Sequence, residues 1–383
     1  MTVAPPSTTS RSSTSASKAS ADARVRGFAS DNNAGVHPEV LAAIAEANTG
    51  HAAAYGEDPW TARAEQLLRA HFGEQAASYL VFNGSGANVL CFRALCRQWE
   101  SVICADTAHV ELNEAGAPER LAGVKLHALA TPDGKLTPEL VATQLGRLGD
   151  THAVQPRVVT VTQSTERGTL YSVGELQVLT EHAHAHGLLV HVDGTRLSNA
   201  AAALDLPLRA ITTDAGVDVV SFGGTKNGLL LGEAVVFLRP ELSANFLYLR
   251  KQTLQLASKG RFIAAQFIAL LDGDLWHRNA AHANAMAARL RDALSDVAEV
   301  RLSQPVQANG VFAVIPPRAL ADLQREWRFN ARQSTGEVRW MCSWDTTPDD
   351  VDAFAAAVAL ACRAASADSE RAHGAVQSAS ARE

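Results

Sequence analysis

VDVVSFGGTKNG, residues 217–228, carries an apolar, β-branched run through two glycines into a single lysine, Lys226. A lysine at the end of a buried strand is uncommon, because its charge is seldom left in an apolar interior. Two interpretations of this segment are open. Lys226 is either a solvated turn residue beside glycines or a lysine whose partly desolvated amine forms a Schiff base with a carbonyl group.

Six further apolar runs flank this segment, and their interiors do not alternate between apolar and polar residues. That pattern is typical of strands covered by helices on both faces. Helical patterns or long connections separate most of the runs, so we predict an α/β domain with a seven-stranded, mostly parallel sheet. Its strands are expected at 79–82, 101–105, 124–129, 157–163, 188–192, 217–222 and 233–238.

The C-terminal third predicts a smaller α/β domain. A helical pattern at 264–294 precedes apolar runs at 309–315 and 337–343 and a helix expected over 345–361. That helix opens with Thr-Pro-Asp-Asp, which supplies a cap residue, a proline for the first turn and acids for the positive end of the helix dipole. The predicted organisation is a disordered tail at 1–26, a large domain at 27–270, a small domain at 271–365 and a second disordered tail at 366–383.

The composition argues against several classes of protein. The net charge of −6 comes without a basic block, so nucleic acid is not an expected partner. No apolar run reaches the roughly 18 residues that span a bilayer, so we expect no membrane insertion. The five cysteines include no CxxC pair, which indicates reduced thiols in a cytoplasmic protein. The Ser-rich, acid-free N-terminus predicts a disordered tail, with an organelle transit peptide as the alternative.

Three more motifs follow the predicted strands. Asp193 comes at the end of an apolar strand, where ligands of open α/β sheets gather, and a carboxylate there suits a protonated pyridine nitrogen. The alternative for Asp193 is a cap of the next helix. The turn FNGSGAN (82–88) presents glycines at a helix start, where backbone N–H groups bind phosphate, although ordinary turns have similar sequences. His109 follows the next strand and suits stacking on a planar cofactor or a purely structural role.

Together these motifs resemble the fold type I pyridoxal phosphate (PLP) enzymes, in which a larger domain of this kind is joined to a smaller C-terminal one. Within that group the sequence is similar to the low-specificity L-threonine aldolases of the β-eliminating lyase group. The resemblance extends from about residue 28 to residue 360. It rests on FASDNNAG (28–35), AYGEDPWTARA (54–64), FNGSGAN (82–88), DTAHVE (106–111), VTQSTERGTLY (161–171), HVDGTRLSNA (191–200), SFGGTKNG (221–228) and RWMCSWDT (339–346).

The resemblance implies a role for each site residue. Lys226 would bind PLP covalently, Asp193 would contact the pyridine nitrogen and His109 would stack on the ring. The phosphate would lie against Gly84, Ser85 and Gly86, and Arg196 would contact both cofactor and substrate. The residues implied for the substrate are Ser30, Tyr55, Arg196 and Arg339.

One position departs from the pattern of the family. Many of these aldolases carry a histidine in the loop after the strand at 157–163, near the substrate hydroxyl, whereas Glu166 stands in that loop here. The catalytic base is therefore Glu166, His109 or an ordered water. The resemblance also implies a homotetramer built from dimers, in which Tyr55, Lys259 and Arg261 reach the site of a neighbouring subunit.

The expected reaction is retro-aldol cleavage of L-threonine and L-allo-threonine to glycine and acetaldehyde. A PLP lyase or aldolase acting on another β-hydroxy amino acid, such as phenylserine, would use the same motifs. A second alternative is a metal-binding protein built on EHAHAHG (181–187). His182 and His186 have the i,i+4 spacing of zinc ligands, but the acid of the zinc protease motif is missing between them, so we expect a solvated helix end and no metal.

Overall fold

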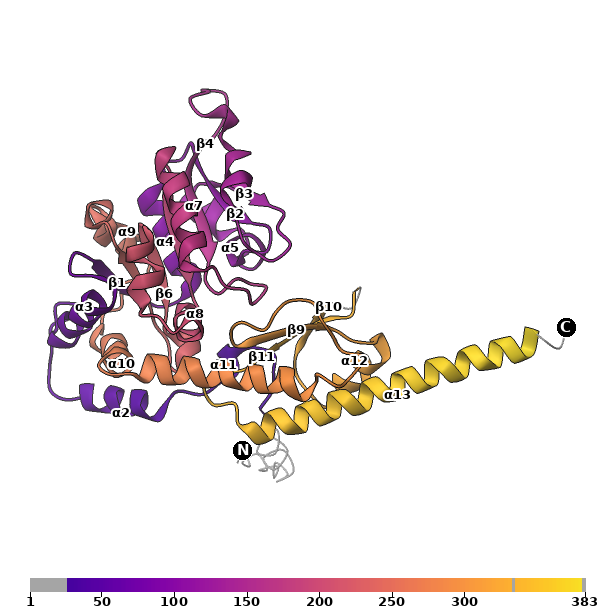
Figure 1. Cartoon of the computed structure of the whole chain (residues 1–383). Coiled ribbons are helices and arrows are strands. Elements are labelled where there is room, and N and C mark those ends of the chain that lie inside the picture. The colour runs from indigo at the N-terminus through magenta and orange to yellow at the C-terminus, as the bar shows by residue number, and fades with distance from the viewer. Residues whose placement is uncertain (1–25, 333–334, 381–383) are drawn as a thin grey trace, which may run out of the picture.

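The computed structural model describes residues 26–332 and 335–380. The predicted N-terminal tail therefore lies outside the described residues, apart from Arg26. A seven-stranded sheet forms the centre of the molecule, in the order β1-β7-β6-β5-β4-β2-β3 (Figure 1). β7 runs antiparallel to both of its neighbours, β1 and β6, and the other strand pairs of this sheet are parallel, so the predicted mostly parallel sheet is confirmed. The strands are β1 (Ala77–Val81), β2 (Glu100–Ala105), β3 (Lys125–Leu129), β4 (Gln155–Thr162), β5 (Leu189–Gly194), β6 (Val219–Gly223) and β7 (Glu233–Phe237).

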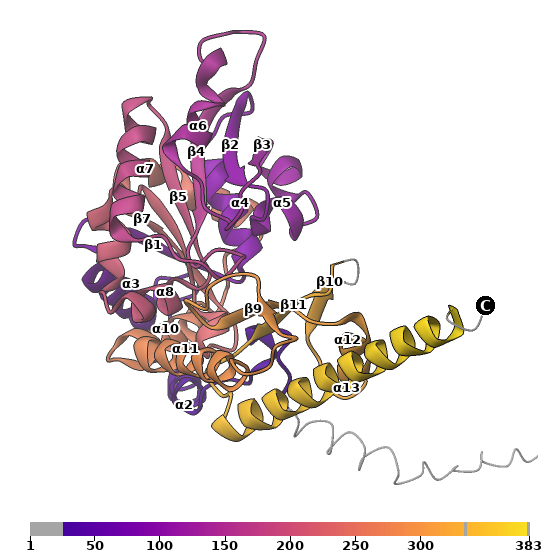
Figure 2. The same ribbon diagram turned by 45° about the vertical axis from the view of Figure 1, so that its right-hand side comes forward.

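Helices cover both faces of this sheet (Figure 2). Val190 and Val192 of β5 point into a core shared with α3, α7, α8 and α10, whereas Leu189 points into a second core shared with α4 and α9. This burial on both faces explains why the strands have continuous apolar sequences. The helices are α2 (Pro38–Ala47), α3 (Pro59–Phe72), α4 (Gly84–Leu95), α5 (His109–Leu112), α6 (Pro138–Ala142), α7 (Val173–Ala185), α8 (Leu197–Leu204), α9 (Phe246–Gln252) and α10 (Arg261–Leu271).

Short helical turns complete the larger part of the chain. They are η1 (Asp31–Asn33), η2 (Pro118–Ala122), η3 (Leu145–Arg147), η4 (Leu208–Ile211), η5 (Thr213–Ala215), η6 (Thr225–Asn227) and η7 (Pro240–Ser243).

A second, antiparallel sheet follows in the order β10-β11-β9-β8. Trp340 and Phe354 are fully buried in its core, where Phe354 stacks on Phe28 at 4.3 Å between ring centroids. Phe28 therefore belongs to this smaller unit, although the predicted boundary assigned it to the large domain. Its elements are α11 (Leu275–Ala293), β8 (Arg301–Leu302), β9 (Gly310–Val314), α12 (Pro317–Leu323), β10 (Asn330–Arg332), β11 (Glu337–Met341) and α13 (Pro348–Ser380).

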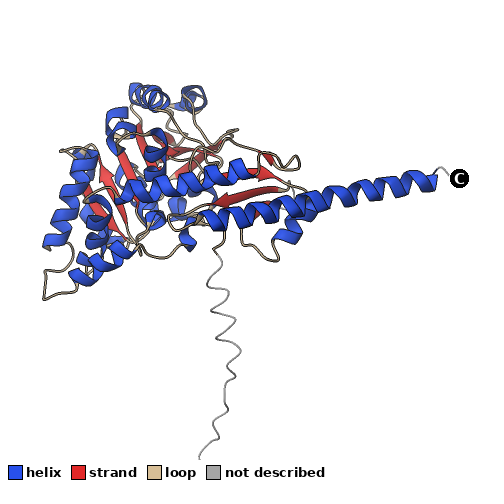
Figure 3. Cartoon of the chain, turned by 60° about the horizontal axis from the view of Figure 1, so that its bottom comes forward, coloured by secondary structure: helices blue, strands red, loops and turns tan. Residues whose placement is uncertain are grey.

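The last helix corrects the sequence prediction. Thr347 and Asp350 form reciprocal hydrogen bonds at its start, as the Thr-Pro-Asp-Asp sequence implies. The prediction of a disordered tail at 366–383 is wrong as far as Ser380, because α13 continues to that residue. The helix extends beyond the body of the molecule (Figure 3). The segment is rich in alanine and has no proline after Pro348, so helix propensity outweighs its polar composition. Among the described residues, no helix is long and apolar enough to cross a membrane.

Candidate active site

Lys226 lies in η6, directly after β6, and its side chain is only partly exposed. Two glycines bring it there. A Cβ atom at Gly223 would collide with the backbone carbonyl of Thr195, so only glycine lets the end of β6 approach the loop after β5 this closely. Burial, followed by the nearby Arg196 guanidinium, lowers the pKa of Lys226. A lowered pKa makes the amine a better nucleophile near neutral pH, which favours the functional interpretation over a solvated turn.

Asp193 is buried at the C-terminal end of β5, between Thr162 of β4 and Ser221 of β6. Its Oδ1 accepts hydrogen bonds from the backbone N–H of Thr195 at 3.1 Å and its hydroxyl at 2.6 Å. Its Oδ2 accepts one from Asn88 Nδ2 at 2.9 Å. Burial alone would raise the pKa of Asp193, but these donors outweigh it and lower the pKa. The carboxylate stays charged, and helix α8 starts after Arg196 without a side-chain cap, so Asp193 is not a helix cap.

A cavity of about 370 Å³ opens at this edge of the sheet. That volume lies in the range of small-molecule sites. At one end is the start of α4, whose first N–H groups have no acceptor inside the helix. The lining residues come from six loops and strands: Asn32, Phe82, Asn83, Gly84, Ser85, Asn88, His109, Glu114, Thr195, Thr225, Lys226, Leu231 and Glu233.

Gly84 and Ser85 line this cavity, whereas Gly86 is not among its lining residues. The Gly86 N–H donates to the cap residue Asn83 at 2.8 Å, and the side chain of Gln255 lies against its Cα. The position offered to an anion is therefore the N-terminus of α4 at Gly84 and Ser85.

His109, the first residue of α5, also lines the cavity. Its Nδ1 lies 2.9 Å from Glu114 Oε1, and Glu114 is fully buried. The hydrogen bond to Glu114 raises the pKa of His109 above its usual value, although partial burial acts in the opposite direction. The imidazole thus has a fixed orientation at the mouth of the site.

Arg196 is held in a buried ion pair with Asp31. Its Nε and Nη2 donate to the two carboxylate oxygens of Asp31 at 2.7 and 3.0 Å, and Asn309 donates to the same carboxylate at 3.1 Å. Burial would raise the pKa of Asp31, but Arg196 and Lys226 lower it to about 2. The pKa of Arg196 is raised in spite of burial, chiefly by Asp31. Both groups are therefore charged at every working pH.

Arg339, on β11, faces Arg196 across a small cavity between the two sheets. Its Nη2 donates to the carbonyl of Ala29 at 3.4 Å, and its buried Nε has no hydrogen-bond partner among the described residues. Burial and then the charge of Arg196 lower the pKa of Arg339. A guanidinium with unused donors beside a second one is a good receptor for a carboxylate.

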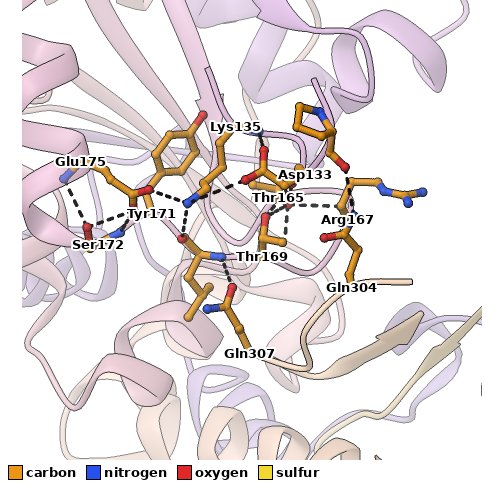
Figure 4. A network of polar contacts seen from close by, with 12 residues as sticks. Asp133, Lys135, Thr165, Arg167, Thr169, Tyr171, Ser172, Glu175, Gln304 and Gln307 are labelled. Carbon is orange, nitrogen blue, oxygen red and sulfur yellow. Dashed lines mark hydrogen bonds and ion pairs between the residues drawn. The ribbon is translucent and has the colours of Figure 1, made fainter. Parts of the chain in front are cut away.

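Glu166 lines the same small cavity and a neighbouring one of about 320 Å³, together with Arg339. It does not line the cavity of Lys226. The loop that carries it is held by contacts of its neighbours, and Figure 4 shows Thr165 and Thr169 donating to the carbonyl of Asp133. Thr165 and Thr169 share a hydrogen bond at 2.6 Å, and Arg167 forms a two-fold ion pair with Glu337 at 2.9 and 3.0 Å. No described residue donates a hydrogen bond to the carboxylate of Glu166.

The remaining predicted site residues lie apart from the cavity. Ser30 Oγ accepts the N–H of Asn32 at the start of η1. Tyr55 is half exposed, with the ammonium group of Lys251 4.7 Å from its ring centroid. Lys259 lines a shallow surface pocket, and Arg261 donates hydrogen bonds to the backbone carbonyls of Thr49 and Gly50. Within one chain, the structure does not bring Tyr55, Lys259 or Arg261 to Lys226.

The sequence analysis missed three buried polar residues of the site: Asn88, Glu114 and Glu233. Glu233 accepts the N–H of Gly224 at 2.8 Å, and burial raises its pKa to about 7. The available signals were an acid at the start of the apolar strand β7 and an Asn in the first turns of the apolar helix α4. Neither signal is specific without the spatial neighbours.

The histidine cluster at 182–186 lies at the end of α7. His184 Nε2 is 2.9 Å from Asp218, and His186 contacts the backbone of His182. In the described part of the chain, no three His, Cys, Asp or Glu side chains are placed to bind a metal ion. These contacts account for His184 and His186 structurally, whereas the buried Nε2 of His182 has no hydrogen-bond partner among the described residues.

The chemistry of the cavity fits PLP. It offers one amine with a lowered pKa, a flat imidazole and a helix N-terminus for a phosphate. The buried Asp193 carboxylate does not line the cavity but accepts hydrogen bonds from Asn88 and Thr195, which do. The fold and this set of groups define the class of fold type I PLP enzymes, and the structural comparisons agree. A serine palmitoyltransferase of Sphingomonas wittichii superposes with a TM-score of 0.68 over 89% of this chain and 88% of its own, at 17% identity, a likeness of fold alone.

Comparison with known proteins is more specific. The family model described as beta-eliminating lyase matches residues 27–316, and the chain belongs to this family. A low specificity L-threonine aldolase of Pseudomonas aeruginosa is 46% identical over 335 residues, covering 87% of this chain and 97% of that protein. A threonine aldolase of Leishmania major superposes with a TM-score of 0.82 at 30% identity, covering 86% and 98% of the two chains.

Proposed function

We propose that this protein is a PLP-dependent L-threonine aldolase that cleaves L-threonine and L-allo-threonine to glycine and acetaldehyde. The observation that carries the proposal is the meeting of Lys226, with its lowered pKa, and the charged Asp193 beside the start of α4. The similarity to threonine aldolases over nearly their whole length supports the same substrate class.

When bound, PLP supplies an electron sink for the carbanion that carbon–carbon cleavage leaves on the amino acid. In this proposal Lys226 would hold the cofactor covalently, and the Asp193 carboxylate would favour protonation of its pyridine nitrogen. His109 would pack on the ring, and the N–H groups of Gly84 and Ser85 would hold the phosphate.

The substrate carboxylate is held by Arg339 and Arg196, with Ser30 beside them. Arg196 already gives Nε and Nη2 to Asp31, which leaves Nη1 for a ligand, whereas Arg339 has most of its donors unused. Fixing the carboxylate fixes the rotation about the amino acid's Cα. Such fixing would let these arginines select which bond at Cα is cleaved.

Glu166 is the proposed base that takes the proton of the β-hydroxyl group. It lies beside Arg339 and Arg196, on the side of the site where the carboxylate would bind, and its loop is anchored on both sides. His109 is the alternative base, because its pKa is raised by Glu114 and it lines the cofactor cavity. The Glu166→Gln and His109→Phe variants distinguish the two.

We also propose a cytoplasmic homotetramer. Five free cysteines, four of them buried, suit a reducing compartment. Tyr55, half exposed and remote from Lys226 in its own chain, is proposed to contribute to the site of a neighbouring subunit together with Lys259 and Arg261. Analytical ultracentrifugation of the purified protein tests the tetramer.

The experiment that tests the activity measures glycine and acetaldehyde from L-threonine, L-allo-threonine and the two D-isomers. Equimolar products from both L-isomers alone are expected. Lys226→Ala should abolish them, while Lys125→Ala, an exposed lysine on β3, should leave them unchanged. A yellow protein that releases no aldehyde from either L-isomer would refute the threonine assignment and favour a bulkier substrate such as phenylserine.

A further inference from the structure

Asn88 lies on the first turns of α4, is 2% exposed and connects two buried acids. Its Nδ2 donates one hydrogen bond to Asp193 Oδ2 at 2.9 Å and another to Glu114 Oε1 at 3.0 Å. Both acceptors belong to carboxylates, and a carboxylate that is ionised can only accept. The amide must therefore turn its NH₂ group toward them, and its Oδ1 is left buried without a described partner.

The two carboxylate oxygens of Asp193 accept different numbers of hydrogen bonds, and this difference gives the contact with Asn88 a function. Oδ1 already receives two hydrogen bonds from Thr195, which fill its acceptor positions. Oδ2 receives only the bond from Asn88 and keeps one position for a further donor. The oxygen with room for a pyridine N–H is thus the oxygen that Asn88 holds.

Glu114 fixes the other end of the same amide. Its Oε1 accepts from Asn88 and is also 2.9 Å from His109 Nδ1, and its side chain has no exposed surface. Asn88 suits this bridge because it offers two donors and no charge. An aspartate here would place a third negative charge in the cluster, and a shorter side chain could not span both acids.

We propose that Asn88 is a positioning residue that orients Asp193 Oδ2 toward the pyridine nitrogen of PLP, with Glu114 as its second anchor. This inference rests on the proposed role of Asp193. Without Asn88, Oδ2 loses the one hydrogen bond that it accepts from the described residues, and the carboxylate is less well fixed. A hydrogen bond between a neutral and a charged group contributes enough to change an affinity about tenfold.

The test uses PLP labelled with ¹⁵N in the ring and follows its nitrogen resonance in the full-length holoprotein. In Asn88→Ala the resonance is expected to shift toward the unprotonated value at neutral pH, and PLP should bind the apoprotein about tenfold more weakly. Asn88→Ser retains one short donor and should fall between wild type and Asn88→Ala. Glu114→Ala should shift the resonance in the same direction, because it removes the second anchor.

Thr180→Val is the matched control. Thr180 is a buried residue of α7 that donates to the carbonyl of Ala215 at 2.6 Å and does not line the cavity. This variant should lower the melting temperature and leave the ¹⁵N resonance and the PLP affinity unchanged. The readout therefore separates loss of a buried hydrogen bond from loss of positioning.

The outcomes distinguish failure of the proposed function from failure of the Asn88 proposal alone. A wild-type resonance at the unprotonated value would refute the role of Asp193 and, with it, the proposed function. A protonated nitrogen in wild type with the same resonance and an unchanged PLP affinity in Asn88→Ala would overturn the Asn88 proposal alone. If Asn88→Ala does not fold, the same criterion applied to Asn88→Ser decides.

Discussion

Replacing Asp31 with asparagine should destabilise the protein by about 2 kcal/mol at neutral pH. Asparagine has the shape of the protonated acid, so the variant isolates the charge that Arg196 contacts through two hydrogen bonds. The pKa of Asp31 is about 2 in the folded chain against 3.8 for an ordinary aspartate. At about 1.4 kcal/mol per pKa unit, that difference gives the stated magnitude. Asp31 is 2% exposed, so solvent screening does not reduce it.

The pH dependence follows from the direction of the shift. Because the folded pKa is lowered, the stabilisation is complete above about pH 4 and is lost as the pH falls toward 2. Urea unfolding of wild type and Asp31→Asn, at equal protein and PLP concentrations, should give a constant difference from pH 5 to 8 and a narrowing one below pH 4.

Asp272→Asn is the control for this prediction. Asp272 pairs with Arg63 at 2.9 Å on the surface, and an exposed pair contributes less than about 1 kcal/mol. Equal costs for the two variants, or an Asp31→Asn difference that grows as the pH falls, would refute the reasoning.

Three further predictions concern packing and chemistry. Gly223→Ala should lower the free energy of unfolding by about 1–3 kcal/mol and weaken PLP binding, because the new Cβ meets the backbone of the loop after β5. The control is Gly174→Ala, whose new Cβ would have no atom within 4 Å and which should leave the melting temperature unchanged. Phe354→Ala should cost about 3–5 kcal/mol in chemical unfolding, and Leu360→Ala, 74% exposed on the same helix, less than about 0.5 kcal/mol. Glu166→Gln should lower kcat for L-threonine by about 10²-fold with the bound chromophore retained, and an unchanged kcat would assign the base to His109 or water.

The sheet could be predicted from the sequence because each strand is buried on both faces and therefore reads as a continuous apolar run. The contacts between segments that are far apart in the chain could not be predicted from the sequence. Phe28 stacks on Phe354 across more than 300 residues, and no local pattern in the chain connects them. The C-terminal tail was wrongly predicted because its composition is polar and small, although alanine-rich sequences favour the helix that α13 forms there.

Some residues of the candidate site could likewise be predicted from the sequence, and others could not. Asp193 lies at the end of its strand, and Gly84, His109 and Lys226 come within four residues after theirs. The rule that ligands gather at the C-terminal edge of such a sheet therefore predicted that they would meet. Asn88 and Glu114 are one helical turn or more beyond their strands, where a polar residue is normally exposed. Only their burial beside other polar groups in the folded chain identifies them.

Arg196 and Arg339 have the same chemistry but different surroundings, so we expect them to have different roles. Arg196 is paired with Asp31 before any ligand arrives, so its charge is already balanced and it mainly fixes the geometry around Lys226. Arg339 is partly buried with its Nε fully buried, its pKa is lowered and no described carboxylate pairs with it. A buried charge without a partner is unfavourable, and an incoming substrate carboxylate relieves that cost. Under the proposed function, the free energy for substrate recognition would therefore come mainly from Arg339, on the small sheet, while the large sheet would hold the cofactor. Binding of an amino acid would then use both parts of the chain at once.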